Sequence, residues 1–290
     1  MRNTGSVWAE RDVAVSADPA VRLFVAQSQG PADRALLVIH GGPDWDHSYL
    51  REPLGRLAGR RRLILPDLRG CGRSTRGLAD REYTPDAATA DLAALLDVLG
   101  IAEADVLGFS YGGLLAQRLG LAAPHRVRKL IIASSSVLPV PPGAFEGWAE
   151  RDRRTAAARR AWSDPALSGP ELTRAAAIAQ APADLWRQDA MPDYLARLQR
   201  VRFSAEWLRP WRAGTLPPAH HDDAAPRLAA LGLPILLLHG RQDMTFPAAL
   251  ARQAAALIPA ARAVILSGAG HMTHVDRPGP WIAALSGFLA

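Results

Sequence analysis

Cysteine and lysine are almost absent from this chain of 290 residues. Cys71 is the only cysteine and Lys129 is the only lysine. A single cysteine excludes a disulfide within the chain and a cysteine-based metal cluster. Long hydrophobic runs are also lacking, because no segment approaches the ~18 apolar residues of a membrane-spanning helix. The first residues, sequence MRNT, lead into no apolar stretch of the kind found in signal peptides. We therefore expect a cytoplasmic protein that does not associate with membranes.

No segment carries a strong excess of positive or of negative residues. The net charge is +6, but the arginines are scattered among acidic residues. The densest group, between residues 151 and 160, lies beside Glu146, Glu150 and Asp152. This mixture predicts a solvated helix face and argues against a nucleic-acid partner. The sequence HHDD at 220–223 is interpreted as an exposed loop. We accordingly expect no metal, no cofactor, and a small molecule or short peptide as the binding partner.

What the chain does contain is a series of short apolar or alternating segments. Such segments predict eight strands, at 11–16, 21–26, 35–39, 63–65, 105–107, 129–133, 234–238 and 262–266. Helical patterns at 87–99, 113–119, 248–257 and 280–289 lie between or after them. Strands that alternate with helices predict an α/β fold with a mostly parallel central sheet.

The alternation of strand and helix patterns stops at about residue 138, where the sequence PVPPG at 139–143 predicts a stiff linker. From there to about residue 227 no strand-like alternation occurs, and helical patterns appear at 171–180 and 194–200. Five of the eight tryptophans belong to this region. We therefore predict a core domain of residues 1–137 and 228–290, interrupted late in the sheet order by a helical cap domain of residues 138–227.

The segment Gly108–Gly112, sequence GFSYG, carries the clearest chemical signal. It follows an apolar strand and precedes a helical pattern, which is the context of a nucleophile elbow. Glycines on both sides of Ser110 leave room for a cramped turn that projects the serine hydroxyl from the sheet. A serine presented in this way attacks carbonyl carbon when a base accepts its proton.

The base and the residue that orients it are expected on loops that follow late strands. His271 follows the last predicted strand, and Asp243 follows the strand before it. The chain order Ser110, Asp243, His271 is that of the α/β-hydrolases. His274 competes as base, but Gly270 gives the loop before His271 more freedom. Asp222 and its neighbour Asp223 compete as the acid, although they follow no strand.

A tetrahedral intermediate needs two N–H donors for its oxyanion. We assign these to Tyr111, the residue after the serine, and to Gly42 in the sequence HGGP at 40–43. His40 stands at a strand end and is expected to make a structural hydrogen bond. In the sequence DLRGCGRS at 67–74, Asp67 and Arg69 are expected to tie loops together.

These motifs together resemble those of the α/β-hydrolase superfamily, and more narrowly those of the proline iminopeptidase group. The resemblance covers nearly the full chain and rests on the HGGP, DLRGCGRS and GFSYG segments, although Tyr111 stands where that group usually has tryptophan. It implies Ser110, Asp243 and His271 as a catalytic triad and the inserted helices as a lid. Four lid tryptophans are candidates for substrate binding: Trp148, Trp162, Trp186 and Trp207.

One departure from the group affects the expected substrate. In proline iminopeptidases a tryptophan–glutamate pair in the lid holds the substrate amino group. Trp162 resembles the start of that stretch, but the glutamate is missing after it, which leaves Glu171 or Glu206 as substitutes. We expect a serine hydrolase that cleaves a small apolar or aromatic ester or amide, of the kind found in specialised metabolism. The alternatives are a true proline iminopeptidase and a non-hydrolytic lyase or ligand-binding protein of the same fold.

Overall fold

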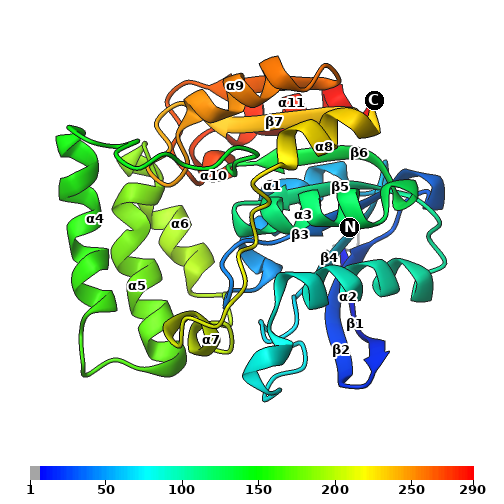
Figure 1. Ribbon diagram of the computed structural model, residues 1–290, viewed down its shortest axis with the longest axis horizontal. Helices are drawn as coiled ribbons and strands as arrows, with labels where there is room; N and C mark the ends of the chain where they lie inside the picture. The colour runs from blue at the N-terminus through cyan, green and yellow to red at the C-terminus, as the bar shows by residue number, and fades with distance from the viewer. Residues whose placement is uncertain (1–6) are drawn as a thin grey trace, which may run out of the picture.

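The computed structural model describes residues 7–290 and is built around one eight-stranded sheet (Figure 1). The strands are β1 (Trp8–Ala17), β2 (Ala20–Ser28), β3 (Ala35–Ile39), β4 (Arg62–Pro66), β5 (Ala104–Phe109), β6 (Val127–Ala133), β7 (Ile235–Gly240) and β8 (Ala261–Leu266). Their spatial order is β1-β2-β4-β3-β5-β6-β7-β8. Only the pairs β1–β2 and β2–β4 are antiparallel. The predicted mostly parallel sheet is therefore confirmed.

The helices connect successive strands and cover both faces of the sheet. The α-helices are α1 (Arg51–Leu54), α2 (Pro85–Val98), α3 (Tyr111–Ala122), α4 (Ala149–Trp162), α5 (Gly169–Asp184), α6 (Met191–Leu198), α7 (Leu208–Arg212), α8 (Ala224–Leu231), α9 (Ala248–Leu257), α10 (Thr273–Asp276) and α11 (Pro278–Leu289). Short 3₁₀ segments are η1 (Ala32–Arg34), η2 (His47–Leu50), η3 (Gly55–Leu57), η4 (Asp80–Glu82), η5 (Pro124–Arg126) and η6 (Gln188–Ala190). Thr84 caps α2 by accepting a hydrogen bond from Ala87 N at 3.1 Å, and Pro85 follows it at the first helical position.

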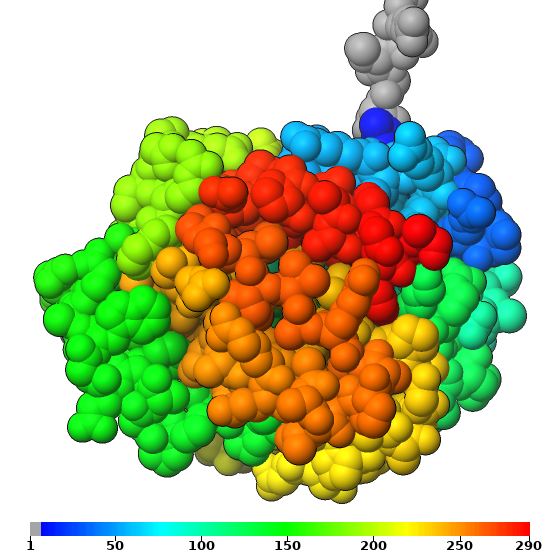
Figure 2. Space-filling view, turned by 90° about the horizontal axis from the view of Figure 1, so that it is seen from above, coloured from blue at the N-terminus to red at the C-terminus, as the bar shows by residue number. Residues whose placement is uncertain are grey.

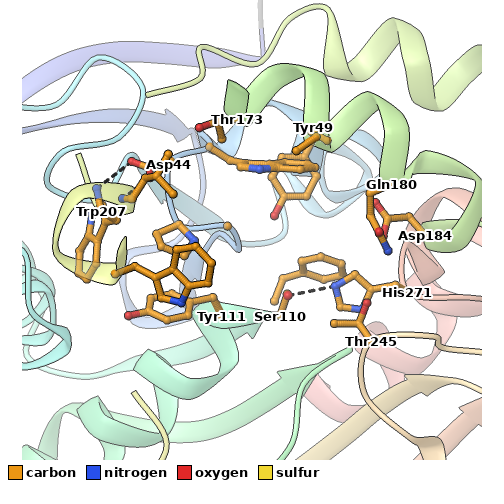
Figure 3. Close-up of a pocket in the computed structure, with 18 of the residues that line it drawn as sticks. Asp44, Tyr49, Ser110, Tyr111, Thr173, Gln180, Asp184, Trp207, Thr245 and His271 are labelled. Atoms are coloured by element: carbon orange, nitrogen blue, oxygen red, sulfur yellow. Dashed lines mark hydrogen bonds between the residues drawn. The ribbon is translucent and has the colours of Figure 1, made fainter. Parts of the chain in front are cut away.

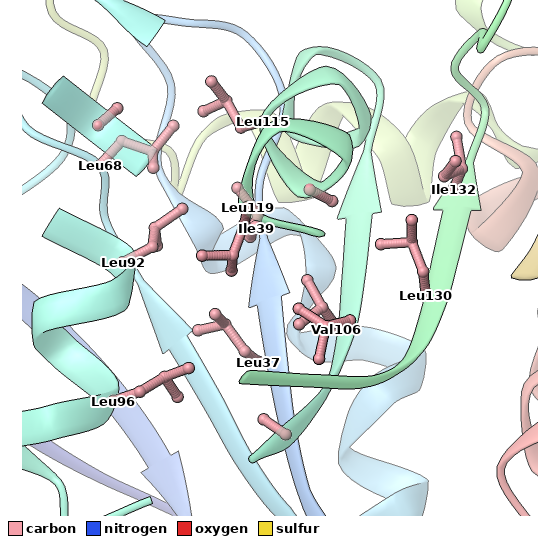
Figure 4. Packing of buried hydrophobic residues seen from close by; sticks show 14 of the residues in the cluster. Leu37, Ile39, Leu68, Leu92, Leu96, Val106, Leu115, Leu119, Leu130 and Ile132 are labelled. Atoms are coloured by element: carbon pink, nitrogen blue, oxygen red, sulfur yellow. The ribbon is translucent and has the colours of Figure 1, made fainter. Parts of the chain in front are cut away.

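Continuous apolar runs form the central strands because both faces of the sheet are covered. Along β3, Leu37 and Ile39 face the layer that contains α2 and α3, whereas Leu36 and Val38 face the layer that contains α1 and α11. Figure 4 shows the first of these interfaces, with leucines of α2 and α3 packed over β3 and β5. Burial on both faces explains why these strands show no alternation of polar and apolar residues.

The segment between β6 and β7 carries helices α4 to α8. In Figure 1, α4, α5 and α6 lie beside one another on one side of the sheet, and α7 lies close below them. This is the late helical insertion that the sequence predicts. The predicted boundary at residues 227 and 228 falls within α8, which packs against α3 rather than against the other inserted helices. The division into a core and a cap domain remains a prediction.

The C-terminal segments complete the molecule. Viewed from above, residues coloured orange to red, from β8 and α9 to α11, cover much of the visible face, and the green helices of the insertion lie beside them (Figure 2). Among residues 7–290, no helix is both long enough and apolar enough to cross a membrane.

Candidate active site

Ser110 occupies a sharp turn between β5 and α3. Its backbone has φ +54° and ψ −122°, an unusual conformation for a residue with a side chain. The turn is held because Ser110 N donates to Ala133 O at 2.9 Å and Gly113 N donates to Ser110 O at 2.8 Å. The adjacent helix begins at Tyr111, so the hydroxyl stands over the positive end of α3. This is the strand–turn–helix context that the sequence predicts.

The turn depends on glycine because backbone passes very close to it. A Cβ on Gly112 would lie 2.2 Å from Ile39 O. We expect Gly112→Ala to destabilise the protein by about 3 kcal/mol or more, since the clash is with backbone that cannot move aside. Gly120→Ala in the same helix is the matched control, because its Cβ would have its nearest neighbour at 3.8 Å. That change should be neutral or stabilise α3 by up to about 1 kcal/mol. Denaturant unfolding measures both, and equal losses in the two variants would contradict this role of Gly112.

The structure brings Ser110, His271 and Asp243 together in one hydrogen-bonded chain. His271 Nε2 lies 3.0 Å from Ser110 Oγ (Figure 3). On the other side of the ring, His271 Nδ1 lies 3.0 Å from Asp243 Oδ2. Asp243 follows β7 and His271 follows β8, so both loops meet Ser110 at the carboxyl edge of the parallel strands. Residues 161 positions apart along the chain are thereby within proton-transfer distance.

The surroundings of Asp243 and His271 favour an ionised Asp243 carboxylate and a more basic His271 imidazole. Burial alone would raise the pKa of Asp243, but the charges and hydrogen bonds of His271 and His239 hold it well below its usual range. Two amides, Thr245 N at 2.7 Å and Phe246 N at 3.0 Å, donate to the other carboxylate oxygen. Burial alone would lower the pKa of His271, yet the Asp243 carboxylate outweighs it and raises that pKa.

His274, the competing candidate for the base, points elsewhere. It is fully buried, and its ring contacts Phe109 and Trp281 with centroid distances of 5.1 and 5.7 Å. Burial lowers the pKa of His274 well below its usual value. The structure thus places His271, and not His274, on the serine. The competing acids Asp222 and Asp223 are exposed and lie in the segment that leads into α8.

The loop after β3, which contains Gly41 and Gly42, also approaches Ser110 closely. A Cβ on Gly41 would come within 2.9 Å of Ser110 Cβ, so only glycine allows this approach. Gly41 N already donates to the Tyr49 hydroxyl at 2.8 Å. Gly42, with φ +118°, and Tyr111 both line the cavity beside Ser110. The arrangement is compatible with the two predicted oxyanion donors.

His40 and the 67–74 segment have the structural contacts that the sequence predicts. His40 Nε2 accepts a hydrogen bond from Leu68 N at 3.0 Å, and its Nδ1 lies 2.7 Å from Gly41 O. Arg69 makes a buried two-pronged pair with Asp91 at 2.6 and 2.7 Å. Asp67 accepts hydrogen bonds from the His47 side chain at 2.5 Å and from Arg73 N at 2.9 Å. These groups connect the loops behind the site.

A cavity of about 650 Å³ opens above Ser110, and seven of the 21 residues that line it are aromatic. Its aromatic lining consists of Trp45, Tyr49, Phe109, Tyr111, Trp162, Trp207 and Trp211. Two of the four candidate tryptophans, Trp162 and Trp207, line it, whereas Trp148 and Trp186 are not among its lining residues. Trp148 precedes α4 and packs against Phe145, whereas Trp186 is covered by the Arg154 guanidinium.

Two tryptophans that line the cavity, Trp45 and Trp211, are not among the residues predicted from the sequence. Trp211 belongs to the same tryptophan-rich insertion, and Trp45 follows the HGGP loop by two residues. The position of Trp45 so close to that loop is the sequence feature from which its place in the cavity wall could have been predicted. Trp207 is fixed over the site by Asp44, whose carboxylate accepts hydrogen bonds from Trp207 N at 3.0 Å and Leu208 N at 2.9 Å.

Neither glutamate that the sequence offered as an amine-binding group reaches the cavity. Glu171 is exposed on α5. Glu206 accepts hydrogen bonds from the Tyr83 hydroxyl at 2.5 Å and from Gly77 N at 3.0 Å, and it lines a different surface pocket. The carboxylate that does reach the cavity from the insertion is Asp184, the last residue of α5.

Comparison with known proteins agrees with this geometry. The model of the alpha/beta hydrolase fold family matches residues 34–278. The chain belongs to the α/β-hydrolase fold family. A 2-hydroxymuconate semialdehyde hydrolase of Pseudomonas putida is 28% identical over 271 residues, which cover 90% of this chain and 89% of that protein.

Other relatives of this α/β-hydrolase include the group that the motifs resemble. A proline iminopeptidase of Lactobacillus delbrueckii subsp. bulgaricus is 29% identical over 274 residues, covering 89% of this chain and 90% of that protein. The crystal structure of a proline iminopeptidase-related protein from Thermus thermophilus superposes with a TM-score of 0.72 at 23% identity and covers 97% of both chains. The predicted fold and the resemblance to this group are therefore confirmed, and the relatives named here with an activity are hydrolases or peptidases.

Proposed function

We infer that this α/β-hydrolase is a serine hydrolase that cleaves esters or amides of small, largely apolar or aromatic molecules through an acyl-enzyme. The observation that carries the proposal is the chain of contacts from Ser110 Oγ through His271 to Asp243, with both hydrogen bonds at 3.0 Å, on the floor of an aromatic cavity. Nucleophile, base and orienting acid are in reach of one another before any substrate binds.

In the first half of the reaction, His271 Nε2 accepts the Ser110 proton while Ser110 Oγ bonds to the acyl carbon. The Gly42 and Tyr111 amides donate to the oxyanion that forms, and such a donor contributes about 3 kcal/mol in other serine hydrolases. The tetrahedral intermediate then expels the alcohol or amine, which takes its proton from the imidazolium. Asp243 stabilises the imidazolium and keeps the Nδ1 proton directed toward itself.

In the second half, water replaces the leaving group. His271 removes a proton from that water as its oxygen attacks the acyl carbon, and the collapse returns the proton to Ser110 Oγ. The products are a carboxylic acid and the free enzyme. Apart from substrate and water, these steps use only groups of the chain.

The cavity supports the proposed substrate class. A volume of about 650 Å³ lies in the range of small-molecule sites, and seven of the 21 residues that line it are aromatic. Hydrolysis of aryl acetates, phenylacetates and the corresponding anilides tests the proposal. We expect turnover of at least the esters, with a burst of phenol release that equals the enzyme concentration. Rates no higher than those of the Ser110→Ala variant with every ester and anilide would contradict it.

Proline iminopeptidase is a second candidate function. It is supported by the HGGP and DLRGCGRS segments and by the 29% identity to the Lactobacillus enzyme. Release of nitroaniline from prolyl-4-nitroanilide, compared with the N-acetylprolyl derivative, tests this candidate. A preference for the free amine would support it, whereas no turnover of either substrate, by an enzyme that hydrolyses aryl esters, would exclude it.

A further inference from the structure

The loop that carries His271 is fastened to the helical insertion by one buried side chain. Asp276 is the last residue of α10, five positions after His271, and it is fully buried. One of its carboxylate oxygens accepts hydrogen bonds from Gly270 N at 2.7 Å and from Trp186 N at 2.9 Å. The other accepts a hydrogen bond from Arg187 N at 2.9 Å. Asp276 thus joins the residue before His271 to the segment that follows α5.

Backbone contacts bring the same two segments together. Met272 N donates to the carbonyl oxygen of Asp184, the last residue of α5, at 2.9 Å. A Cβ on Gly270 would lie 2.7 Å from that oxygen and 2.9 Å from Trp186 N, so only glycine allows this approach. The residues on both sides of His271 therefore bond to the insertion, one directly and one through a carboxylate. The end of α5 fixes the position of His271 together with β8.

The three backbone amides are the main partners of the Asp276 carboxylate. Burial raises the pKa of Asp276, whereas the hydrogen bonds from these amides and the charge of Arg187 act against that rise. The Arg187 guanidinium itself pairs with Asp189 and donates to the Asp276 backbone oxygen at 3.2 Å. A buried N–H group that loses its acceptor is costly, so the three bonds hold the two segments in one arrangement.

This arrangement matters for the reaction because His271 must meet two partners at once. Its two ring nitrogens lie 3.0 Å from Ser110 Oγ and 3.0 Å from Asp243 Oδ2, so a small displacement of the ring would lengthen at least one of these contacts. Asp276 is not among the residues that line the cavity. Any effect of its carboxylate on the reaction must therefore pass through the loop that carries His271.

We propose that Asp276 is a positioning residue, which holds His271 in place between Ser110 and Asp243 and makes that place depend on the end of α5. The insertion then contributes to proton transfer as well as to the cavity wall. The inference deepens the proposed function and rests on it for the role of His271 as base. The fastening of the two segments does not depend on that role.

Steady-state kinetics with an aryl ester tests the positioning role. Asp276→Ala removes the acceptor of all three amides and should lower kcat roughly 100-fold, the effect of a displacement of ~1 Å at a reacting group. Asp276→Asn offers one oxygen in place of two, so at least one amide loses its acceptor, and kcat should fall roughly 10-fold. KM should change little in both variants. The asparagine variant keeps the test available if the alanine variant does not fold.

Asp105 provides the matched control position. Its carboxylate is also buried and accepts hydrogen bonds from Arg61 at 2.6 Å and from Arg128 at 2.9 Å. It lies near the start of β5, whereas Ser110 follows the end of that strand. Asp105→Asn should lower the melting temperature but leave kcat unchanged. A loss of kcat as large as that in Asp276→Asn would assign the effect to stability and overturn the proposal.

A second background separates positioning from a general effect on the fold. When Asp276→Asn is added to His271→Ala, the residual activity should not fall further, because no imidazole remains to be positioned. A loss of the same size with and without His271 would show that Asp276 acts on the cavity or the fold as a whole. That result would also overturn the proposal.

Hydrogen exchange tests the fastening without any turnover. Asp276→Asn should speed the exchange of backbone amides in residues 268–273 and in residues 185–188 together, whereas Asp105→Asn should change neither segment. Unchanged exchange in both segments of Asp276→Asn would show that the carboxylate does not join them, and would overturn the proposal. If the unaltered protein hydrolyses no ester, the proposed function fails, and the exchange measurement still decides whether Asp276 holds the loop of His271.

Discussion

Replacing Ser110 with alanine is expected to lower kcat for aryl ester hydrolysis by roughly 10⁴- to 10⁶-fold while KM changes little. The reason is that the acyl group then has no oxygen to bond to, although the cavity that binds the substrate is unchanged. Residual activity should come only from water attack assisted by the oxyanion donors. Steady-state kinetics with an aryl ester that the unaltered protein hydrolyses measures the effect.

The matched control for this variant is Ser163→Ala, at the exposed end of α4. It should retain the activity of the unaltered protein. Circular dichroism should show that both variants fold, since Ser110 Oγ contributes a single partly buried hydrogen bond. Retention of most of the activity by Ser110→Ala would refute a serine mechanism.

Replacing Asp243 with asparagine is expected to lower kcat by about 10⁴-fold, although the side chain keeps its shape. An amide nitrogen opposite His271 Nδ1 would favour the tautomer that carries its proton on Nε2, and that tautomer cannot accept the Ser110 proton. Thr245 N and Phe246 N would still find an acceptor in the amide oxygen, so the loop should remain folded.

The same variant should shift the pH profile. His271 acts as a base only when neutral, so kcat/KM rises with pH through its pKa. Because burial is outweighed by the Asp243 carboxylate, the pKa of His271 lies above its usual value of 6.5. Loss of that carboxylate should move the acid limb of kcat/KM to lower pH. Asp222→Asn, an exposed carboxylate of the other candidate segment, should change neither rate nor limb. If the acid limb of kcat/KM does not shift in Asp243→Asn, the Asp243 carboxylate does not raise the pKa of His271, which would contradict the proposed pairing of the two residues.

The central strands were predictable because they are continuous apolar runs that need burial on both faces. The range 35–39 matches β3, and the helix range 248–257 matches α9. Edge elements were less well defined, since β1 extends to Trp8–Ala17 beyond the predicted 11–16. Its outer residues gain their strand conformation from pairing with β2 rather than from a pattern of their own.

The residues around Ser110 were predictable for a different reason. The elbow needs glycine at position 112, where an added Cβ would lie 2.2 Å from Ile39 O, and the loops after consecutive parallel strands end at one edge of the sheet. The cavity walls were not predictable in the same way. Trp148 and Trp162 lie at opposite ends of α4, and composition does not tell which of them faces inward. Asp184 resembles a surface carboxylate until α6 and the His271 loop cover it.

The most direct test of a nucleophilic Ser110 is covalent labelling with an alkyl fluorophosphonate, read by intact mass and peptide mapping. One adduct per chain, located on Ser110 and absent from the Ser110→Ala variant, is the predicted result. Labelling should slow in Asp243→Asn, because the serine is then less readily deprotonated. An unlabelled Ser110 in folded protein, or an adduct on another residue, would contradict the account and favour a non-hydrolytic binding protein or lyase of the same fold.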